Sequence, residues 1–270
     1  MPTLYIVATP IGNLEDISIR ALRTLSEVPL VAAEDTRKTR RLLSKYGIKT
    51  RLTSYHEHNK DIKLHYLLNH LNTEDLALVS EAGMPGISDP GYELVVAAVQ
   101  SGINIVPIPG PSAVVTALAV SGLPADQFVY LGFLPRRKGQ RRRLLQQVAE
   151  EERTIIAFEA PHRLVATLKD ILDVLGERRI AVCRELTKVH EEVFRGIVSE
   201  AMEHFQEPIG EFTLVMEGKP KGEKALDAPV EEELHRLYEE GFSAKDAIAQ
   251  VAKATGIPKK ELYKAWLQLG

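Results

Sequence analysis

The sequence predicts an α/β protein of two domains, followed by a small all-helical extension. Over the first 217 residues, short apolar runs that predict strands alternate with stretches of helical periodicity. Repeated β-α-β units of this kind imply a mainly parallel sheet covered by helices. Beyond a polar stretch at 217–224 only helical patterns remain. We therefore expect an N-terminal α/β domain at 1–115, a C-terminal α/β domain at 116–220, and a linker with a helical extension at 221–270.

The first domain is expected to contain strands joined by helices. Apolar residues at helical spacing predict a helix over 16–27, and Gly47 is placed to end the basic helix that begins at Thr36. Asp89 and Pro90 are expected to form the N-cap and the first position of a later helix. The helix that follows Pro90 is expected to run to about residue 100. The expected strands are 3–8, 28–33, 76–80 and 103–107, and the other expected helices are 61–72 and 112–120.

The second domain and the extension show the same kinds of pattern. Strands are expected near 128–133, 154–158, 180–184 and 212–217, with helices near 139–150, 161–175 and 199–205. The extension should hold helices at 230–240, 243–254 and 259–269. Its last two helices, joined by a glycine turn, resemble a helix-turn-helix hairpin, a shape that is often only a packing module. Their apolar residues are Ala244, Ala247, Ile248, Val251, Leu262, Trp266 and Leu267.

Composition excludes several classes of protein. The chain has 270 residues, a net charge of −3 and one cysteine, Cys183, so it has no internal disulfide. We expect Cys183 to be buried in a strand, which fits a reducing cytoplasm. The first residues lack the pattern of a signal peptide, and no apolar run approaches the roughly 18 residues that cross a bilayer. The expected location is the cytoplasm, with no membrane partner.

Three glycine-rich loops in the first 112 residues predict a ligand crevice. Each loop follows an apolar strand, and the three loops are 9–13, 80–91 and 108–112. Glycine lets backbone N–H and C=O groups approach a ligand closely, because no Cβ stands in the way. The carboxyl ends of parallel strands meet at one edge of a sheet, so we expect one crevice and an enzyme.

Two basic clusters predict a polyanionic partner. No acidic residue occurs from Thr36 to Tyr55, and 136–143 holds six cations in eight residues. In a chain of nearly neutral charge, such clusters beside a ligand crevice favour nucleic acid, although a solvated helix face and a loop would look the same. The residues expected to bind RNA are Arg37, Lys38, Arg40, Arg41, Arg136, Arg137, Lys138, Arg141, Arg142 and Arg143.

Several long motifs resemble the tetrapyrrole-methylase superfamily. Three segments match motifs of the superfamily. They are the first loop with the acidic residue after it, at 7–17, the Asp-Pro-Gly turn, at 87–91, and the Pro-Gly-Pro-Ser-Ala loop, at 109–113. The amino-acid sequences of four segments resemble one branch of the superfamily, the ribosomal RNA small subunit methyltransferase I family. These segments are Ala8–Leu14, Ala33–Arg37, Ser80–Pro90 and Arg184–Lys188. The resemblance covers about residues 3–217, and the helical tail looks like that family's C-terminal extension.

The resemblance implies a fold, a cofactor and a partner. It implies two α/β domains with S-adenosylmethionine folded in the cleft between them, and methyl transfer to the ribose 2′-oxygen of a decoding-centre cytidine of bacterial 16S rRNA in the small ribosomal subunit. It also implies a homodimer. Carried onto this sequence, the cofactor contacts would be Ile11, Gly12, Gly86, Asp89, Tyr92, Ser112, Ala113, Phe158, Glu159, Thr213 and Leu214. For Asp89 a plain helix cap is the alternative role.

The acceptor hydroxyl is a poor nucleophile at neutral pH, so the reaction calls for alignment and a general base. Our first candidates are Glu81, Glu185 and His190, because each lies in a motif shared with the rRNA branch and adjoins a strand end. Asp35, His56 and Glu57 come next. His56 and His58 are a weak metal pattern without further ligands, so no metal is expected. A tetrapyrrole or diphthamide-type methyltransferase and a non-catalytic RNA-binding module remain the alternatives.

Overall fold

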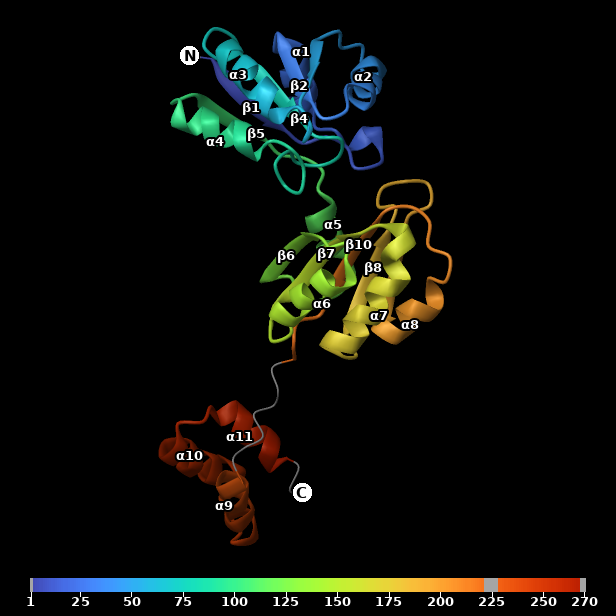
Figure 1. The fold of residues 1–270 in the computed structure, drawn as a ribbon. Coiled ribbons are helices and arrows are strands. Elements are labelled where there is room, and N and C mark those ends of the chain that lie inside the picture. The colour runs from blue at the N-terminus through green and yellow to red at the C-terminus, as the bar shows by residue number, and fades with distance from the viewer. Residues whose placement is uncertain (1, 221–227, 268–270) are drawn as a thin grey trace. The chain divides into compact units, whose positions relative to one another are not determined.

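The computed structural model describes residues 2–220 and 228–267, which fall into two compact units, Met1–Gly218 and Lys219–Gly270. Within the described residues, the first unit holds two five-stranded sheets with helices on their faces, and the second unit is helical (Figure 1). The α/β fold class and the helical extension are confirmed. Residues 221–224 of the polar stretch expected at 217–224, and the last residues of the expected helix 259–269, lie outside the described residues.

The first sheet is entirely parallel. Its strand order is β3-β2-β4-β1-β5, and Leu4 of β1 lies between Leu76 of β4 and Ile105 of β5. Parallel strands need crossover connections, which the intervening helices supply. The strands are β1 (Thr3–Val7), β2 (Leu30–Ala33), β3 (Arg51–Ser54), β4 (Leu76–Val79) and β5 (Asn104–Ile108).

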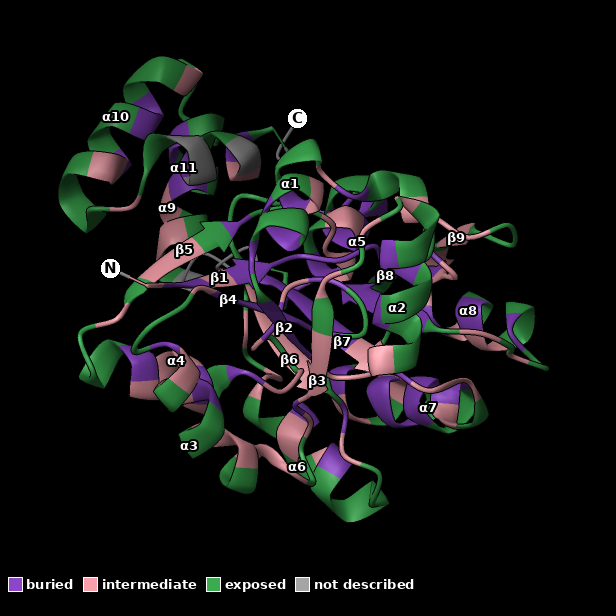
Figure 2. Ribbon diagram, turned by 90° about the horizontal axis from the view of Figure 1, so that it is seen from above, coloured by how far each residue is buried: buried purple, intermediate pink, exposed green. Residues whose placement is uncertain are grey.

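Helices cover both faces of this sheet because its side chains alternate between two apolar cores. Val31 and Ala33 of β2 face α1 (Ile19–Glu27) and α2 (Thr36–Lys45). Leu30 and Ala32 face α3 (Lys60–His70) and α4 (Tyr92–Gln100). Figure 2 shows the buried strands at the centre of the unit, with exposed helix surfaces outside. The carboxyl edge of the sheet is thus left to the loops.

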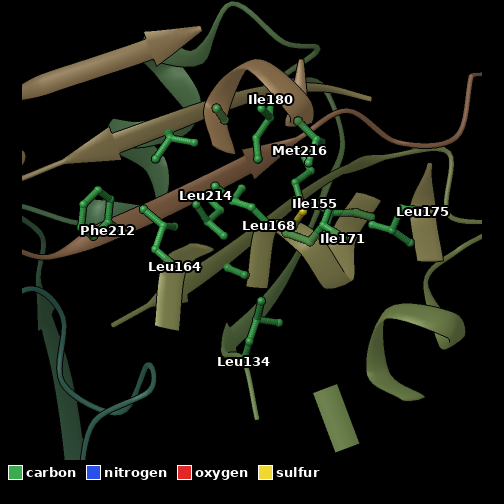
Figure 3. Close-up of a cluster of buried hydrophobic side chains, with 14 of the residues drawn as sticks. Leu134, Ile155, Leu164, Leu168, Ile171, Leu175, Ile180, Phe212, Leu214 and Met216 are labelled. Atoms are coloured by element: carbon green, nitrogen blue, oxygen red, sulfur yellow. The ribbon is translucent and has the colours of Figure 1, made fainter. Parts of the chain in front are cut away.

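The second sheet is mixed. Its order is β6-β7-β10-β8-β9, and only β6 and β7 run parallel. Its strands are β6 (Phe128–Phe133), β7 (Thr154–Glu159), β8 (Arg179–Arg184), β9 (Glu192–Ile197) and β10 (Phe212–Met216). One face packs on α5 (Ala113–Ser121). The other packs on α6 (Lys138–Gln147), α7 (Leu164–Leu175) and α8 (Val198–His204), around the core drawn in Figure 3.

A buried ion pair joins α6 to α7. Arg141 donates through Nε to Asp170 Oδ2 at 2.9 Å, and the side chains of both residues are at least 95% buried. Arg142 bonds the other Asp170 oxygen at 3.2 Å and Asp173 at 2.8 Å. Two of the arginines that we expected to bind RNA therefore hold two helices together, and Arg141 is withdrawn from the RNA-binding set because solvent cannot reach it.

The helical unit has its own small core. It consists of α9 (Ala228–Glu239), α10 (Ala244–Thr255) and α11 (Lys259–Trp266), and Trp266 packs edge-on against Tyr238 with ring centroids 5.2 Å apart. The expected apolar stripe of α10 is confirmed, and Leu262 and Trp266 of α11 are buried in the same core. Leu267 instead ends α11 and is exposed.

Three expectations about local structure were wrong. Strands β3 and β9 were not predicted; both are edge strands with polar side chains, which weakens the alternation that marks a strand. Asp89 does not cap α4, since the N-cap is Gly91 with φ of 145°, and the helix begins at Tyr92. The helix expected over 16–27 begins only at Ile19, after a 3-10 turn at Leu14–Asp16, and the helix expected from 161 begins at Leu164, after a 3-10 turn at Pro161–Arg163.

Arg141→Ala should lower the free energy of unfolding by about 3 kcal/mol, because it leaves Asp170 buried without its main partner. Arg143→Ala, at the exposed position two residues on, should change it by less than about 0.5 kcal/mol. Circular dichroism during urea unfolding measures the difference, since the single tryptophan reports only on the helical unit. Equal losses in the two variants would contradict the structural role of Arg141.

Candidate active site between the two sheets

A cavity of about 410 Å³ lies in the first unit, between its two sheets. The first sheet contributes residues that follow the carboxyl ends of β1, β2, β4 and β5: Ile11, Glu34, the loop 81–89, and Ser112. Crevices at this edge of a parallel sheet are the usual ligand sites of α/β proteins, and the volume suits a small molecule. The crevice inferred from the three glycine loops is this cavity.

The loops that form the first wall are bonded to one another. Thr9 and Gly83 exchange two backbone hydrogen bonds of 2.9 Å, and Ser80 Oγ donates to the carbonyl of Gly83. The backbone of Gly110 lies so close to Ala8 that a Cβ there would come within 3.1 Å of the alanine methyl. These contacts fix the loops as one surface.

The second wall comes from the strand ends and helix of the other sheet. Phe158 and Glu159 end β7, Thr213 lies on β10, and Cys183 lies on β8. Cys183 is buried as expected, and its burial raises the thiol pKa to about 12. The first residues of α5 line the cavity, and the Ser112 side chain makes no cap hydrogen bond, so the backbone N–H groups of this first turn have no partner within the helix.

The turn between β8 and β9 closes the side of the cavity. Leu186 lines the space, and its neighbours Glu185 and Thr187 both have positive φ, at 49° and 67°. Thr187 Oγ1 accepts the Asn13 backbone N–H at 3.0 Å, so the turn is joined to the first loop. Strain of this kind, particularly at a β-branched residue, persists where the surroundings enforce it and is concentrated at functional sites.

Among the described residues that line the cavity, five are carboxylic acids and none is Lys, Arg or His. Three of the five carboxylates have cationic partners from outside the lining: Lys38 for Glu81, Arg163 for Glu159, and Lys188 for Glu211. The other two, Glu34 and Asp89, have no cationic partner among the described residues. The cavity is therefore suited to a ligand that carries positive charge.

The pKa of Asp89 is raised in this cavity. Its burial and then the charge of nearby Glu34 raise its carboxyl pKa to about 7. Glu34 in turn accepts the backbone N–H of Glu81 at 3.0 Å, which holds the two acidic loops together. A carboxyl group that titrates near neutrality in a cleft is a common mark of a functional site.

Two comparisons by sequence identify the family. Residues 3–202 match the tetrapyrrole (corrin/porphyrin) methylases, and residues 224–270 match the RsmI C-terminal HTH domain. A protein of Halalkalibacterium halodurans named ribosomal RNA small subunit methyltransferase I is 50% identical, over 98% of this chain and 95% of its own. The chain belongs to the tetrapyrrole methylase family, in its ribosomal RNA small subunit methyltransferase I branch.

Other similar proteins cover about four fifths of this chain. A Thermotoga maritima protein of the same name is 53% identical over its entire length, yet covers only 81% of this chain, the share that residues 1–218 make up. Solved structures with the same fold include diphthine synthase, with a TM-score of 0.61 at 13% identity, which covers 80% of this chain and 90% of its own. A Thermus thermophilus uroporphyrin-III-C-methyltransferase has a TM-score of 0.56 at 19% identity, covering 80% and 94%.

The structure brings most of the cofactor residues implied by the family to the cavity. These are Ile11, Asp89, Ser112, Ala113, Phe158, Glu159 and Thr213. Four others do not line it. The Leu214 side chain points to the opposite core, Tyr92 is 69% exposed, and Gly86 adopts φ of 82° in the loop beside the cavity. Gly12 permits a close approach instead, since a Cβ there would stand 2.5 Å from Lys188.

Of the three first candidates for the base, the structure places only Glu81 on the cavity. Glu185 accepts the Glu211 backbone N–H at 2.8 Å and pairs with Lys188 at 2.9 Å. Burial alone would raise the Glu185 pKa, but the Lys188 and Glu211 bonds outweigh it and lower the pKa. His190 lies exposed in the turn. Proximity to a motif in the sequence did not distinguish these positions, because the contacts of Glu185 with Lys188 and with the Glu211 backbone depend on the fold.

The basic residues divide into exposed and engaged side chains. Arg37, Arg40 and Arg41 are exposed on α2, and Lys38 reaches Glu81 in an ion pair. At the start of α6, Arg136, Arg137, Lys138 and Arg143 are exposed. The exposed cations lie outside the cavity lining.

Two further findings concern the rest of the described chain. An open hollow of about 880 Å³ lies at the amino ends of β2 and β3 and contains none of the predicted site residues, so we do not assign the chemistry to it. Among the described residues, no helix is long and apolar enough to cross a membrane, and no cluster of metal-ligating side chains occurs.

Asp89→Asn should stabilise the protein at high pH. The Asp89 pKa is about 7 in the folded chain but near 3.8 in an unfolded one. The folded state therefore binds more protons between these values, and stability is lost as the pH rises through 7. We expect the thermal midpoint of the variant to exceed that of the wild type at pH 8 and the gap to shrink toward pH 4. Asp126→Asn, at an exposed position, should show no such trend; a trend shared by both would contradict the assignment.

Proposed function

We propose that the chain transfers a methyl group from S-adenosylmethionine to the ribose 2′-oxygen of a cytidine in 16S rRNA of the small ribosomal subunit. The names of its relatives point to small-subunit rRNA, and the sequence motifs point to that branch. The observation that carries the proposal is the sorting of charge: carboxylates line the cavity, and exposed cations lie outside it. The carboxylates of the cavity suit a cationic cofactor, and the exposed cations outside it suit a polyanion.

The residues present fit S-adenosylmethionine. Its sulfonium and ammonium groups carry positive charge, which Glu34 and Asp89 would attract. Its carboxylate suits the free N–H groups at the start of α5, because a helix N-terminus favours negative charge. The apolar side chains of Ile11 and Phe158 offer surface for the adenine. When bound, the cofactor supplies a methyl group that is open to attack by an oxygen nucleophile.

Glu81 is the residue that we propose to take the proton from the ribose hydroxyl. Its side chain is 42% exposed while it lines the cavity, so an acceptor arriving from outside can reach it. Lys38 bonds one of its oxygens and holds the carboxylate in place. Asp89 lies deeper and is assigned to the cofactor, so the two acids have different roles.

Phosphate contacts would come from the exposed cations. Arg37, Arg40 and Arg41 follow the Glu34–Asp35 turn on α2, and Asp35 caps that helix through the backbone N–H groups of Arg37 and Lys38. The cap fixes where the helix begins and thus where its cations stand. A homodimer, implied by the resemblance, would double this basic surface and belongs to the same proposal.

Purified protein should methylate small subunits, and a subunit whose 16S rRNA carries one 2′-deoxy substitution at the acceptor should be inert. The deoxy RNA lacks the nucleophile but keeps the shape and nearly all phosphate contacts. Mass mapping of the product RNA locates the methyl group. A deoxy substitution at the neighbouring nucleotide is the control and should remain active. Methylation of the deoxy substrate, or activity on tetrapyrroles with none on RNA, would overturn the proposal.

A further inference from the structure

A large apolar side chain stands half exposed at the cavity. Phe133, the last residue of β6, lines the space and is 57% exposed. Ile87, from the first wall, also lines it and is 50% exposed. Their neighbours are in contact, since a Cβ on Gly132 would come within 3.1 Å of Ser88 Oγ. The two side chains thus come from neighbouring segments of opposite walls, the end of β6 and the loop after β4.

A β-bulge turns Phe133 toward the cavity. The register of β6 on β7 shifts between Tyr130 and Phe133, and Gly132 within the shift has φ of 67°. Residues three apart in a regular strand face opposite sides, whereas here Tyr130 and Phe133 both contact Phe158 on the cavity side. Leu131 and Leu134 pack into the opposite core. Bulges that re-aim a side chain are frequent beside active sites.

The ring of Phe133 is held by other rings. Its centroid lies 5.3 Å from that of Phe158 at an interplanar angle of 62°, and Tyr130 contacts Phe158 at 5.3 Å and 70°. The Tyr130 hydroxyl lies 2.7 Å from Ser88 Oγ, which joins the aromatic group to the first wall. Phe133 is thus 57% exposed at the cavity, while the contact of its ring with Phe158 supports it.

Free cations follow Phe133 directly. Arg136 and Arg137 are exposed, and no carboxylate of the described residues is paired with either. They precede α6, whose inner arginines Arg141 and Arg142 are occupied by Asp170 and Asp173. An exposed aromatic ring followed three and four residues later by unpaired arginines is a combination suited to unstacked nucleotides, through the base and the phosphate.

We infer that Phe133 is the platform on which the base of the acceptor nucleotide stacks, with its phosphates at Arg136 and Arg137. This rests on the proposed function and names its nucleotide-binding group. Stacking there would bring the attached ribose to the mouth of the cavity, where Glu81 is reachable. The contact is independent of base identity, so it positions the nucleotide and leaves recognition of the site to the surrounding RNA.

The test compares Phe133→Ala, Phe133→Leu and Phe133→Trp with Phe128→Ala. Phe128 lies on the same strand, is 38% exposed and does not line the cavity. Alanine should lower kcat/KM for small subunits about 10-fold or more, as expected for one lost base–aromatic stack. The leucine variant should be nearly as inactive as the alanine variant, because leucine has apolar surface but no ring face. The tryptophan variant should have a kcat/KM close to that of the wild type. Calorimetric affinity for S-adenosylmethionine should stay within about twofold in all four.

Each outcome separates the inference from the proposed function. If the wild type does not methylate subunits, the proposed function fails first. If the wild type is active and Phe133→Ala equals Phe128→Ala, the stacking role is wrong. A matching loss of cofactor affinity in Phe133→Ala would place the ring against the cofactor and also overturn the inference. Rescue by leucine as complete as by tryptophan would reduce the contact to apolar burial and contradict it.

Discussion

The separation of charge around the cavity is the constraint on which the rest of the first unit depends. Carboxylates come from the ends of β2, β4, β7 and β10 and would repel one another if nothing offset them. Lys38, Arg163 and Lys188 pair with three of them. Burial of Asp89, and then the charge of Glu34, raise the Asp89 pKa to about 7. The fold thus holds an unfavourable arrangement that a cationic ligand would relieve.

The loops can hold that arrangement because the two sheets are joined through them. The Thr9–Gly83 bridge fixes two loops of the first sheet, the Asn13–Thr187 hydrogen bond joins the first loop to the second sheet, and Ser88 contacts Tyr130. Positive φ at Ser88, Glu185 and Thr187 shows that these same joints carry backbone strain.

Local patterns predicted most of the fold and part of the site. Buried strands such as β1 and β4 are mainly apolar runs, and Gly47 follows the end of α2 as predicted, with a positive φ. What escaped prediction depends on partners distant in sequence. Arg141 looked like its exposed neighbours because Asp170 lies 29 residues away, and Phe133 looked like an ordinary strand residue because the bulge appears only in the pairing with β7. Asp89 is of a residue type that often caps helices, but the N-cap of α4 is Gly91, two residues further on.

The most direct test of the charge account is a calorimetric comparison of two ligands that differ in one charge. S-adenosylmethionine carries the sulfonium, and its demethylated thioether product does not. In the double variant Glu34→Gln, Asp89→Asn at pH 8, affinity for S-adenosylmethionine should fall at least about tenfold more than affinity for the thioether, because both ligands keep the ammonium group but only S-adenosylmethionine loses the attraction to its sulfonium. An equal loss for both ligands, or no loss for either, would contradict the claim that these carboxylates select a positively charged cofactor.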